Sequence, residues 1–169
     1  MSNKVKYSLS ALGATTALIL SIAGYEGYTS RPVIPVPGDV PTIGYGTTSY
    51  PNGVKVKMTD KPIDRKTAEH YLRNYVSKTE MQFKKSLSGV KLAQTEYDVY
   101  VDFVYQYGMV TWNKSSIRSN LLKGNYKQAC TSLLKYKYVA KRDCSIRSNN
   151  CFGVWTRQVA RYEKCMEAN

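Results

Sequence analysis

Two carboxyl groups and a hydroxyl lie close together early in the sequence. Glu26 follows an apolar stretch, Asp39 lies in a Pro-Gly turn, and Thr42 follows three residues later. A carboxyl at the end of an apolar helix is partly desolvated, which favours its protonated form and suits a general acid. A carboxylate in a wet turn stays ionised, and a neighbouring hydroxyl can help it to hold a water molecule. Glycosidases divide acid and base roles between two carboxyl groups in this way.

The segment that must position Glu26 is the apolar stretch before it. Residues 8–24 carry no charge, and Lys4 and Lys6 precede them. The stretch is shorter than the about 20 residues of a spanning helix and longer than the roughly 7–15 residues of a signal-peptide core. Many of its residues are Ala, Gly, Ser or Thr, so it should insert weakly. We interpret residues 1–24 as a signal-anchor segment with its N-terminus inside the cell. A cleaved signal peptide, a permanent anchor and a releasable anchor all remain open.

Residues 25–169 are expected to form one catalytic domain of the α+β class, mainly helical with a small β-hairpin lobe. Two β-like runs flank a Pro-Asn-Gly turn and predict the hairpin, and helical periodicity predicts the rest. The expected strands are 40–45 and 54–58, and the expected helices are about 64–85, 94–107, 116–123, 125–136 and 154–166. A cleft between the two lobes would be a common place for a site.

Local signals mark the ends and faces of these helices. Asp64 is the expected cap of the first helix, and Gly108 is the expected end of the second. Residues on helical spacing predict the inner face of the first helix, and these are Ala68, Leu72, Tyr75, Val76 and Phe83. Residues 137–152 are expected to form an irregular basic loop.

The charge balance favours an anionic partner. Lysine and arginine number 25 against 12 acids, which gives a formal net charge of +13. Anionic lipid and the acidic polymers of a cell envelope both suit such a surface. The sequence has no zinc spacing, phosphate loop or RNA-binding signature, so we expect no nucleic acid partner. His70 lies in a charged helix and is expected to be solvated.

Four cysteines lie in the last quarter of the sequence. An even number favours two disulfides and an oxidising compartment. Cys130 and Cys165 lie on two late helices that could be joined by their pairing, and Cys144 and Cys151 would then close a small loop. This connectivity is placed first of the three that are possible. No histidine lies near these cysteines, so we expect no metal site.

Several segments resemble one family of enzymes. The run GYEGYTSRPVIPVPGDVPTIGYGTT resembles the active-site region of phage-type lysozymes, the endolysins. VYVDFVYQYG resembles their central helix, LLKGNYKQAC the helical pair that follows, and FGVWTRQVARYEKC the closing helix. The resemblance covers Gly24 to the C-terminus. Together with the weak N-terminal anchor, it makes the chain similar to the signal-anchor-release endolysins.

The resemblance implies hydrolysis of the bond between N-acetylmuramic acid and N-acetylglucosamine in peptidoglycan. Glu26 matches the family's catalytic acid, and Thr42 matches its threonine within an intact Thr-Ile-Gly-Tyr-Gly run. The usual aspartate lies about six residues before this threonine, where this chain has Val36, whereas Asp39 lies three before it. Either the Val-Pro-Gly turn brings Asp39 to the same place, or the enzyme relies on Glu26 and Thr42. The resemblance implies an inverting reaction in which Glu26 protonates the leaving oxygen and Asp39 and Thr42 hold the attacking water.

The resemblance also assigns roles on the later helices. It implies that Arg157 pairs with and orients Glu26, and that Tyr105 and Gln106 lie near the sugar groove. It requires no metal or cofactor. It implies a monomer exported by a bacterial host, tethered to the inner membrane and then released to the periplasm.

Other interpretations remain open. Glu26 could simply mark a membrane border, and Asp39 could form an Asx turn. A lytic transglycosylase could work with Glu26 alone and would leave anhydro-muramic ends. A non-catalytic cationic protein could instead bind and disrupt envelopes through its charge.

Overall fold

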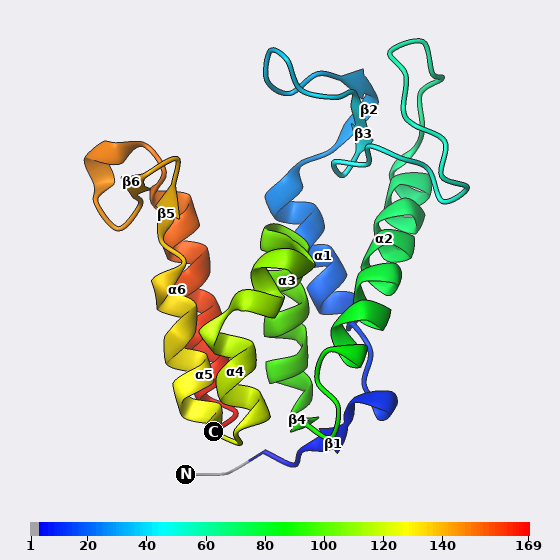
Figure 1. Ribbon diagram of the computed structural model, residues 1–169. Coiled ribbons are helices and arrows are strands. Elements are labelled where there is room, and N and C mark those ends of the chain that lie inside the picture. The colour runs from blue at the N-terminus through cyan, green and yellow to red at the C-terminus, as the bar shows by residue number, and fades with distance from the viewer. Residues whose placement is uncertain (1–3) are drawn as a thin grey trace. The chain divides into compact units, whose positions relative to one another are not determined.

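The computed structural model describes residues 4–169 and divides the chain into two compact units. The β-hairpin unit comprises residues 14–81, and the helical unit combines residues up to 13 with residues 82–169. The predicted signal-anchor segment therefore contributes to both units, and its first three residues lie outside the described part. The helices are α1 (Thr16–Glu26), α2 (Arg65–Lys85), α3 (Gln94–Lys114), α4 (Ser116–Leu122), α5 (Tyr126–Ser132) and α6 (Phe152–Met166). The strands are β1 (Tyr7–Ser8), β2 (Thr29–Val33), β3 (Thr42–Gly44), β4 (Lys91–Leu92), β5 (Tyr138–Val139) and β6 (Arg142–Asp143) (Figure 1).

The apolar N-terminal stretch contributes α1 to the hairpin unit. The Thr15 hydroxyl caps this helix by accepting the Leu18 amide at 3.1 Å, which satisfies one of the free donors at a helix start. Buried side chains of α1 supply part of the core, and these are Leu18, Ile19, Ile22 and Ala23. Within residues 4–169, no helix has both the length and the apolar character needed to cross a bilayer.

The hairpin forms between segments that differ from those predicted. β3 lies inside the expected run at 40–45, but its antiparallel partner is β2, with Val33 opposite Thr42 and Thr29 opposite Gly44. The prediction of a strand at 54–58 was wrong, because that segment makes only an isolated bridge between Ser49 and Lys55. Figure 1 shows β2 following the C-terminal end of α1, so the hairpin and Glu26 are adjacent along the chain.

The long helix α2 confirms its predicted cap and most of its inner face. The Asp64 carboxylate accepts the Thr67 amide at 2.7 Å. The expected inner residues are buried except for Tyr75, which is 58% exposed, so that assignment was wrong. His70 is exposed, as expected.

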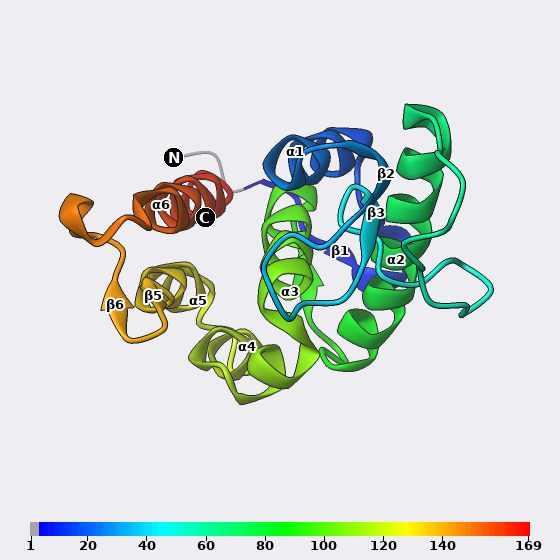
Figure 2. The ribbon, with the colours of Figure 1, turned by 90° about the horizontal axis from the view of Figure 1, so that it is seen from above.

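The helical unit is built around α3. Gly108 interrupts α3 with a φ of 77° and a ψ of 163°, so the predicted end is a break after which the helix continues to Lys114. Helix α4 packs against α5, and α5 against α6 (Figure 2). Disulfides join Cys130 to Cys165 and Cys144 to Cys151, the connectivity that the sequence analysis placed first. The first of them links α5 to α6.

Candidate active site

Glu26 is the last residue of α1, and the following glycine ends the helix. Gly27 has a φ of 71°, and its amide donates to the Ala23 carbonyl at 3.2 Å. A left-handed φ is inexpensive only for glycine, so the chain turns sharply after the acid. Glu26 itself is exposed. The expected burial of this residue at the helix end was therefore wrong: the buried face of α1 ends at Ile22 and Ala23, and residues 24–26 are exposed.

The Thr-Ile-Gly-Tyr-Gly run forms β3 and a tight turn after it. Ile43 is fully buried, and it exchanges two backbone hydrogen bonds of 2.9 Å with Thr47. The buried isoleucine fixes the turn to the unit's core, and the paired backbone groups close it. The turn therefore holds a defined shape beside the end of α1.

Two glycines in this run permit close approaches. A Cβ on Gly44 would lie 2.8 Å from the Ala68 Cβ on α2, and Gly44 has a φ of 67°. A Cβ on Gly46 would lie 3.4 Å from Oε2 of Glu26. Gly44 thus lets the hairpin sit against α2, while Gly46 leaves room beside the Glu26 carboxyl. The acid and the hairpin are built as one local arrangement.

Replacing Gly44 by alanine is expected to destabilise the protein by more than the same change at Gly53. Both positions have left-handed φ angles, but a Cβ on Gly53 would meet nothing within 4 Å. The backbone cost is shared, and overpacking against Ala68 adds about 1–3 kcal/mol at Gly44 alone. Urea unfolding of the two variants measures the difference. Equal losses would show that the hairpin can shift away from α2 without cost.

Asp39 lies on the connection between β2 and β3, and Thr42 is the first residue of β3. The Asp39 amide donates to the Val36 carbonyl at 3.0 Å, and its Oδ1 accepts the Val40 amide at 2.9 Å. Asp39 is exposed, in keeping with the wet turn expected for it. The Thr42 hydroxyl donates to the Val33 carbonyl across the hairpin at 3.4 Å, a long contact that a bound water or sugar could replace.

Contacts with the start of α2 hold the hairpin in place. The Tyr28 hydroxyl donates to the Ile63 carbonyl at 2.6 Å, and the Arg65 guanidinium lies 4.4 Å from the Tyr28 ring centre. The Tyr45 ring lies 5.7 Å from that of Tyr28. These contacts place an aromatic pair and a cation beside the segment that carries Glu26.

Arg157 is buried in the helical unit, where it binds an acid that the sequence analysis did not single out. Its guanidinium donates to Asp102 of α3 at 2.6 Å. Arg161, one turn further along α6, donates to the other Asp102 oxygen, also at 2.6 Å. Burial alone would raise the pKa of Asp102, but the charges of Arg161 and Arg157 outweigh it and lower that pKa. The pairing of Arg157 with Glu26 stays a prediction.

The sequence contains signals that could have predicted this network of Asp102, Arg157 and Arg161. Asp102 is a lone acid within an otherwise apolar run of α3, and two arginines lie four residues apart on α6. A buried acid requires a partner, and the i, i+4 spacing puts both arginines on one helix face. Burial also lowers the pKa of Arg161, while the charge of Asp102 opposes that effect.

Tyr105 and Gln106 lie on α3 in the helical unit, and both are half-buried. The Gln106 Oε1 atom is buried and accepts no hydrogen bond from residues 4–169. A buried acceptor without a donor is costly unless something else satisfies it. This atom is therefore suited to accept a hydrogen bond from a ligand.

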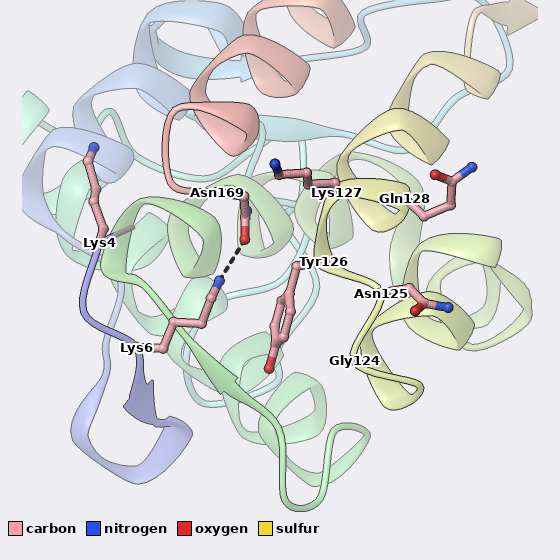
Figure 3. A pocket seen from close by; sticks show the side chains of 8 residues that line it. All are labelled: Lys4, Lys6, Gly124, Asn125, Tyr126, Lys127, Gln128 and Asn169. Atoms are coloured by element: carbon pink, nitrogen blue, oxygen red, sulfur yellow. Dashed lines mark hydrogen bonds between the residues drawn. The ribbon is translucent and has the colours of Figure 1, made fainter. Parts of the chain in front are cut away.

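A pocket of about 790 Å³ in the helical unit lies apart from these residues. Its lining contains none of the predicted site residues and consists of Lys4, Lys6, Gly124, Asn125, Tyr126, Lys127, Gln128 and Asn169. The Lys6 ammonium donates a hydrogen bond of 2.9 Å to the Asn169 side chain (Figure 3). Lys6 also pairs with the buried Glu96. The pocket thus lies where Lys4 and Lys6 meet the loop before α5 and the C-terminal residue, and none of the predicted site residues lines it.

The fold is that of phage endolysins. An endolysin of Escherichia coli O157:H7 phage FAHEc1 superposes with a TM-score of 0.76 at 23% identity, over 94% of this chain and 96% of that one. A lysozyme of phage P22 gives 0.75 at 21% identity, over 92% and 99%. The active form of the P1 phage endolysin gives 0.72 at 15% identity, over 94% and 87%. The predicted α+β lysozyme-like fold is confirmed.

The sequence itself matches the Phage lysozyme family over residues 23–167. The chain belongs to this family. Comparison with curated proteins gave no match. The matched range begins before Glu26 and includes both units.

Proposed function

We propose that the chain is an endolysin that hydrolyses the β-1,4 bond between N-acetylmuramic acid and N-acetylglucosamine. The observation that carries this proposal is that the Glu26 carboxyl lies beside Gly46, which is the last residue of the intact Thr42–Gly46 run. The acid is held at a helix end, against the hairpin, and Gly46 leaves space beside its carboxyl. From there the carboxyl can reach a glycosidic bond that lies along the hairpin. Family membership supports the same reaction class.

In the proposed reaction, protonated Glu26 gives its proton to the glycosidic oxygen as the bond from C1 to that oxygen breaks. A water molecule held by Asp39 and Thr42 attacks C1 from the opposite face, and Asp39 accepts its proton. The sugar configuration is inverted, which calls for a carboxyl separation of roughly 6.5–9.5 Å. The proposal uses no metal or cofactor. A bound glycan would cover the exposed Glu26 and exclude water from it.

Three residues of the helical unit are proposed to support this reaction. Gln106 would offer its unsatisfied Oε1 to a sugar hydroxyl or acetamido N–H, and Tyr105 would contact a sugar face. Arg157, whose guanidinium is held by Asp102, would orient Glu26. We propose a monomer that takes peptidoglycan as its substrate and no nucleic acid.

Mass analysis of digested peptidoglycan tests the reaction type. Wild type is expected to yield reducing muramic ends, and Asp39→Asn is expected to yield the same ends about 10²-fold or more slowly, because the water loses its base. Asp60→Asn makes the same chemical change elsewhere in the hairpin unit, and as the matched control it should keep the wild-type rate. Anhydro ends would favour the transglycosylase that needs Glu26 alone, and reducing ends released by Asp39→Asn at the wild-type rate would show that hydrolysis relies on Glu26 and Thr42 without Asp39.

We propose that residues 1–24 tether the protein to the inner membrane before it is released to the periplasm. The described fold supports release, because apolar residues of this segment are buried in the protein rather than left for lipid. Gly13 and Thr16 are exposed. Replacing both by leucine should raise the membrane-bound fraction without disturbing the Thr15 cap.

Fractionation of cells measures this fraction. Leucine at exposed Thr59 and Ser88 adds similar apolar surface outside the segment and serves as the control. If the Gly13→Leu, Thr16→Leu protein fractionates and lyses cells as the control does, the releasable anchor is wrong.

A further inference from the structure

The basic segment between α5 and α6 forms a small cross-linked loop that projects at the start of α6 (Figure 1). We call residues 137–152 the stapled loop. Strands β5 and β6 pair within it, and the disulfide between Cys144 and Cys151 closes it. The Asn149 side chain also donates to the Asp143 carbonyl at 2.8 Å. These links hold the loop in one shape, which lowers the entropy cost of using it as a binding surface.

One face of the stapled loop is electrically balanced. The Lys137 ammonium donates to Asp143 at 2.7 Å, and the Ser145 hydroxyl donates to the same carboxylate at 2.6 Å. These hydrogen bonds, that of Lys137 first, lower the pKa of Asp143 to about 2. The carboxylate therefore stays ionised at neutral pH and is already engaged. Tyr138 lies opposite Asp143 in the ladder and shares its face.

The rest of the loop carries exposed cations and apolar side chains. Val139 lies opposite Arg142 in the ladder and shares its face, and Lys141 occupies the turn between them. The Arg142 guanidinium donates to the Asn149 carbonyl at 3.4 Å, which brings its side chain to the segment that carries Ile146 and Arg147. Arg147 is exposed and lies over the Phe152 ring, and Ile146 beside it is 51% exposed. Among residues 4–169, no carboxylate lies within ion-pair distance of the three cations. We call Val139, Lys141, Arg142, Ile146 and Arg147 the cationic face.

The turn at the tip has an unfavourable backbone. Ala140 and Lys141 have φ angles of 46° and 67°. Two-residue hairpin turns of this hand are normally filled by Asn-Gly, because other residues are strained at positive φ. Strain of this kind gathers at functional positions. Here it places an exposed lysine in the turn, where a glycine would be easier to accommodate.

We infer that the cationic face docks on an anionic phospholipid surface. Lysine and arginine attract the headgroup phosphates, and Val139 and Ile146 can enter the boundary between headgroups and acyl chains. Exposed aliphatic side chains between the cations favour lipid over a water-soluble polyanion, which would leave them in water. This contact is separate from the N-terminal segment and independent of glycan hydrolysis. It would hold the released enzyme close to the membrane.

Vesicle sedimentation tests this inference, with phosphatidylglycerol mixed into phosphatidylcholine. Replacing Lys141, Arg142 and Arg147 by glutamine is expected to weaken binding about 10²-fold, from roughly fivefold for each cation. Replacing Val139 and Ile146 by serine should weaken it at least about fivefold, because apolar burial is lost. Pure phosphatidylcholine should bind little in every case.

Two controls separate the loop from the rest of the molecule. Glutamine at exposed Lys61, Lys85 and Lys123 removes the same charge elsewhere and should leave most of the binding intact. All proteins carry Glu26→Gln and keep the N-terminal segment, so neither catalysis nor the anchor differs among them. Circular dichroism verifies that each protein is folded.

The results distinguish three explanations of binding: lipid docking by the loop, general charge or the anchor alone, and a water-soluble polyanion. Weaker binding by both loop variants, with the control unchanged, supports lipid docking. Equal binding by loop and control variants would overturn it in favour of net charge or of the anchor alone. If serine at Val139 and Ile146 changes nothing, while soluble polyphosphate binds wild type and loses affinity with the charge variant, the face serves a water-soluble polyanion and the lipid proposal is wrong.

Discussion

Glu26→Gln is expected to lower peptidoglycan hydrolysis by at least about 10³-fold, since it removes the only proton donor of the proposed reaction. Glutamine keeps the size and polarity of the side chain but cannot give a proton to the leaving oxygen. Because Glu26 is exposed and glutamine keeps the size of its side chain, the variant should remain folded. Initial rates of reducing-end release measure the first effect, and urea unfolding measures the second.

Glu163→Gln is the matched control for this experiment. Glu163 is exposed on α6 and has no role in the proposed reaction, so the same chemical change there should leave the rate unchanged. Lysis by Glu26→Gln at the wild-type rate, without glycan cleavage, would contradict the proposed function. It would instead establish the cationic protein that disrupts envelopes by charge alone.

Local sequence signals predicted several helix ends. The cap at Asp64 and the break at Gly108 depend on side-chain hydrogen bonding and on glycine's positive φ, and both act within a few residues. The helical continuation from Gly108 to Lys114 was not predicted. The disulfide pairing that was placed first of three is confirmed, and it rested on the assumption that the helices carrying Cys130 and Cys165 pack together.

The strand that pairs with β3 could not be predicted from local sequence signals in the same way. β2 contains Pro32, and proline in a strand normally argues against pairing or confines it to an edge. The paired strand β3 approaches α2 closely at Gly44 and Ala68, residues 24 positions apart. The predicted run at 54–58 had better strand composition, but it forms only the isolated bridge at Lys55. Long-range packing outweighed local propensity here.

The catalytic roles of Glu26, Asp39 and Thr42 stay predictions. These residues could be singled out from the sequence because they belong to one continuous run. Asp102 was missed because its role depends on α3 packing against α6, which brings the acid to two arginines. The exposure of Glu26 was missed for a similar reason, since burial depends on what covers a residue in three dimensions.

Asp102→Ala is expected to destabilise the protein by about 3–5 kcal/mol. The substitution leaves the guanidiniums of Arg157 and Arg161 buried without their shared carboxylate, and unpaired buried charge is strongly unfavourable. Asp98→Asn, at a half-buried position on the same helix, should cost less than about 1 kcal/mol. Urea unfolding at neutral pH compares the two. A loss of less than about 1 kcal/mol for Asp102→Ala would show that water reaches the arginines when the acid is removed.

The effect should also depend on pH, with a sign set by the lowered pKa of Asp102. A carboxyl whose pKa is lower in the folded state contributes its full stabilisation above its unfolded pKa of about 3.9, and loses it as the pH falls through the folded value. The stability difference between wild type and Asp102→Asn should therefore be constant near neutral pH and shrink below about pH 4. A difference that grows in acid would mean that the folded protein binds the proton more tightly than the unfolded chain. That result would contradict the double arginine pairing as the source of the network's stability.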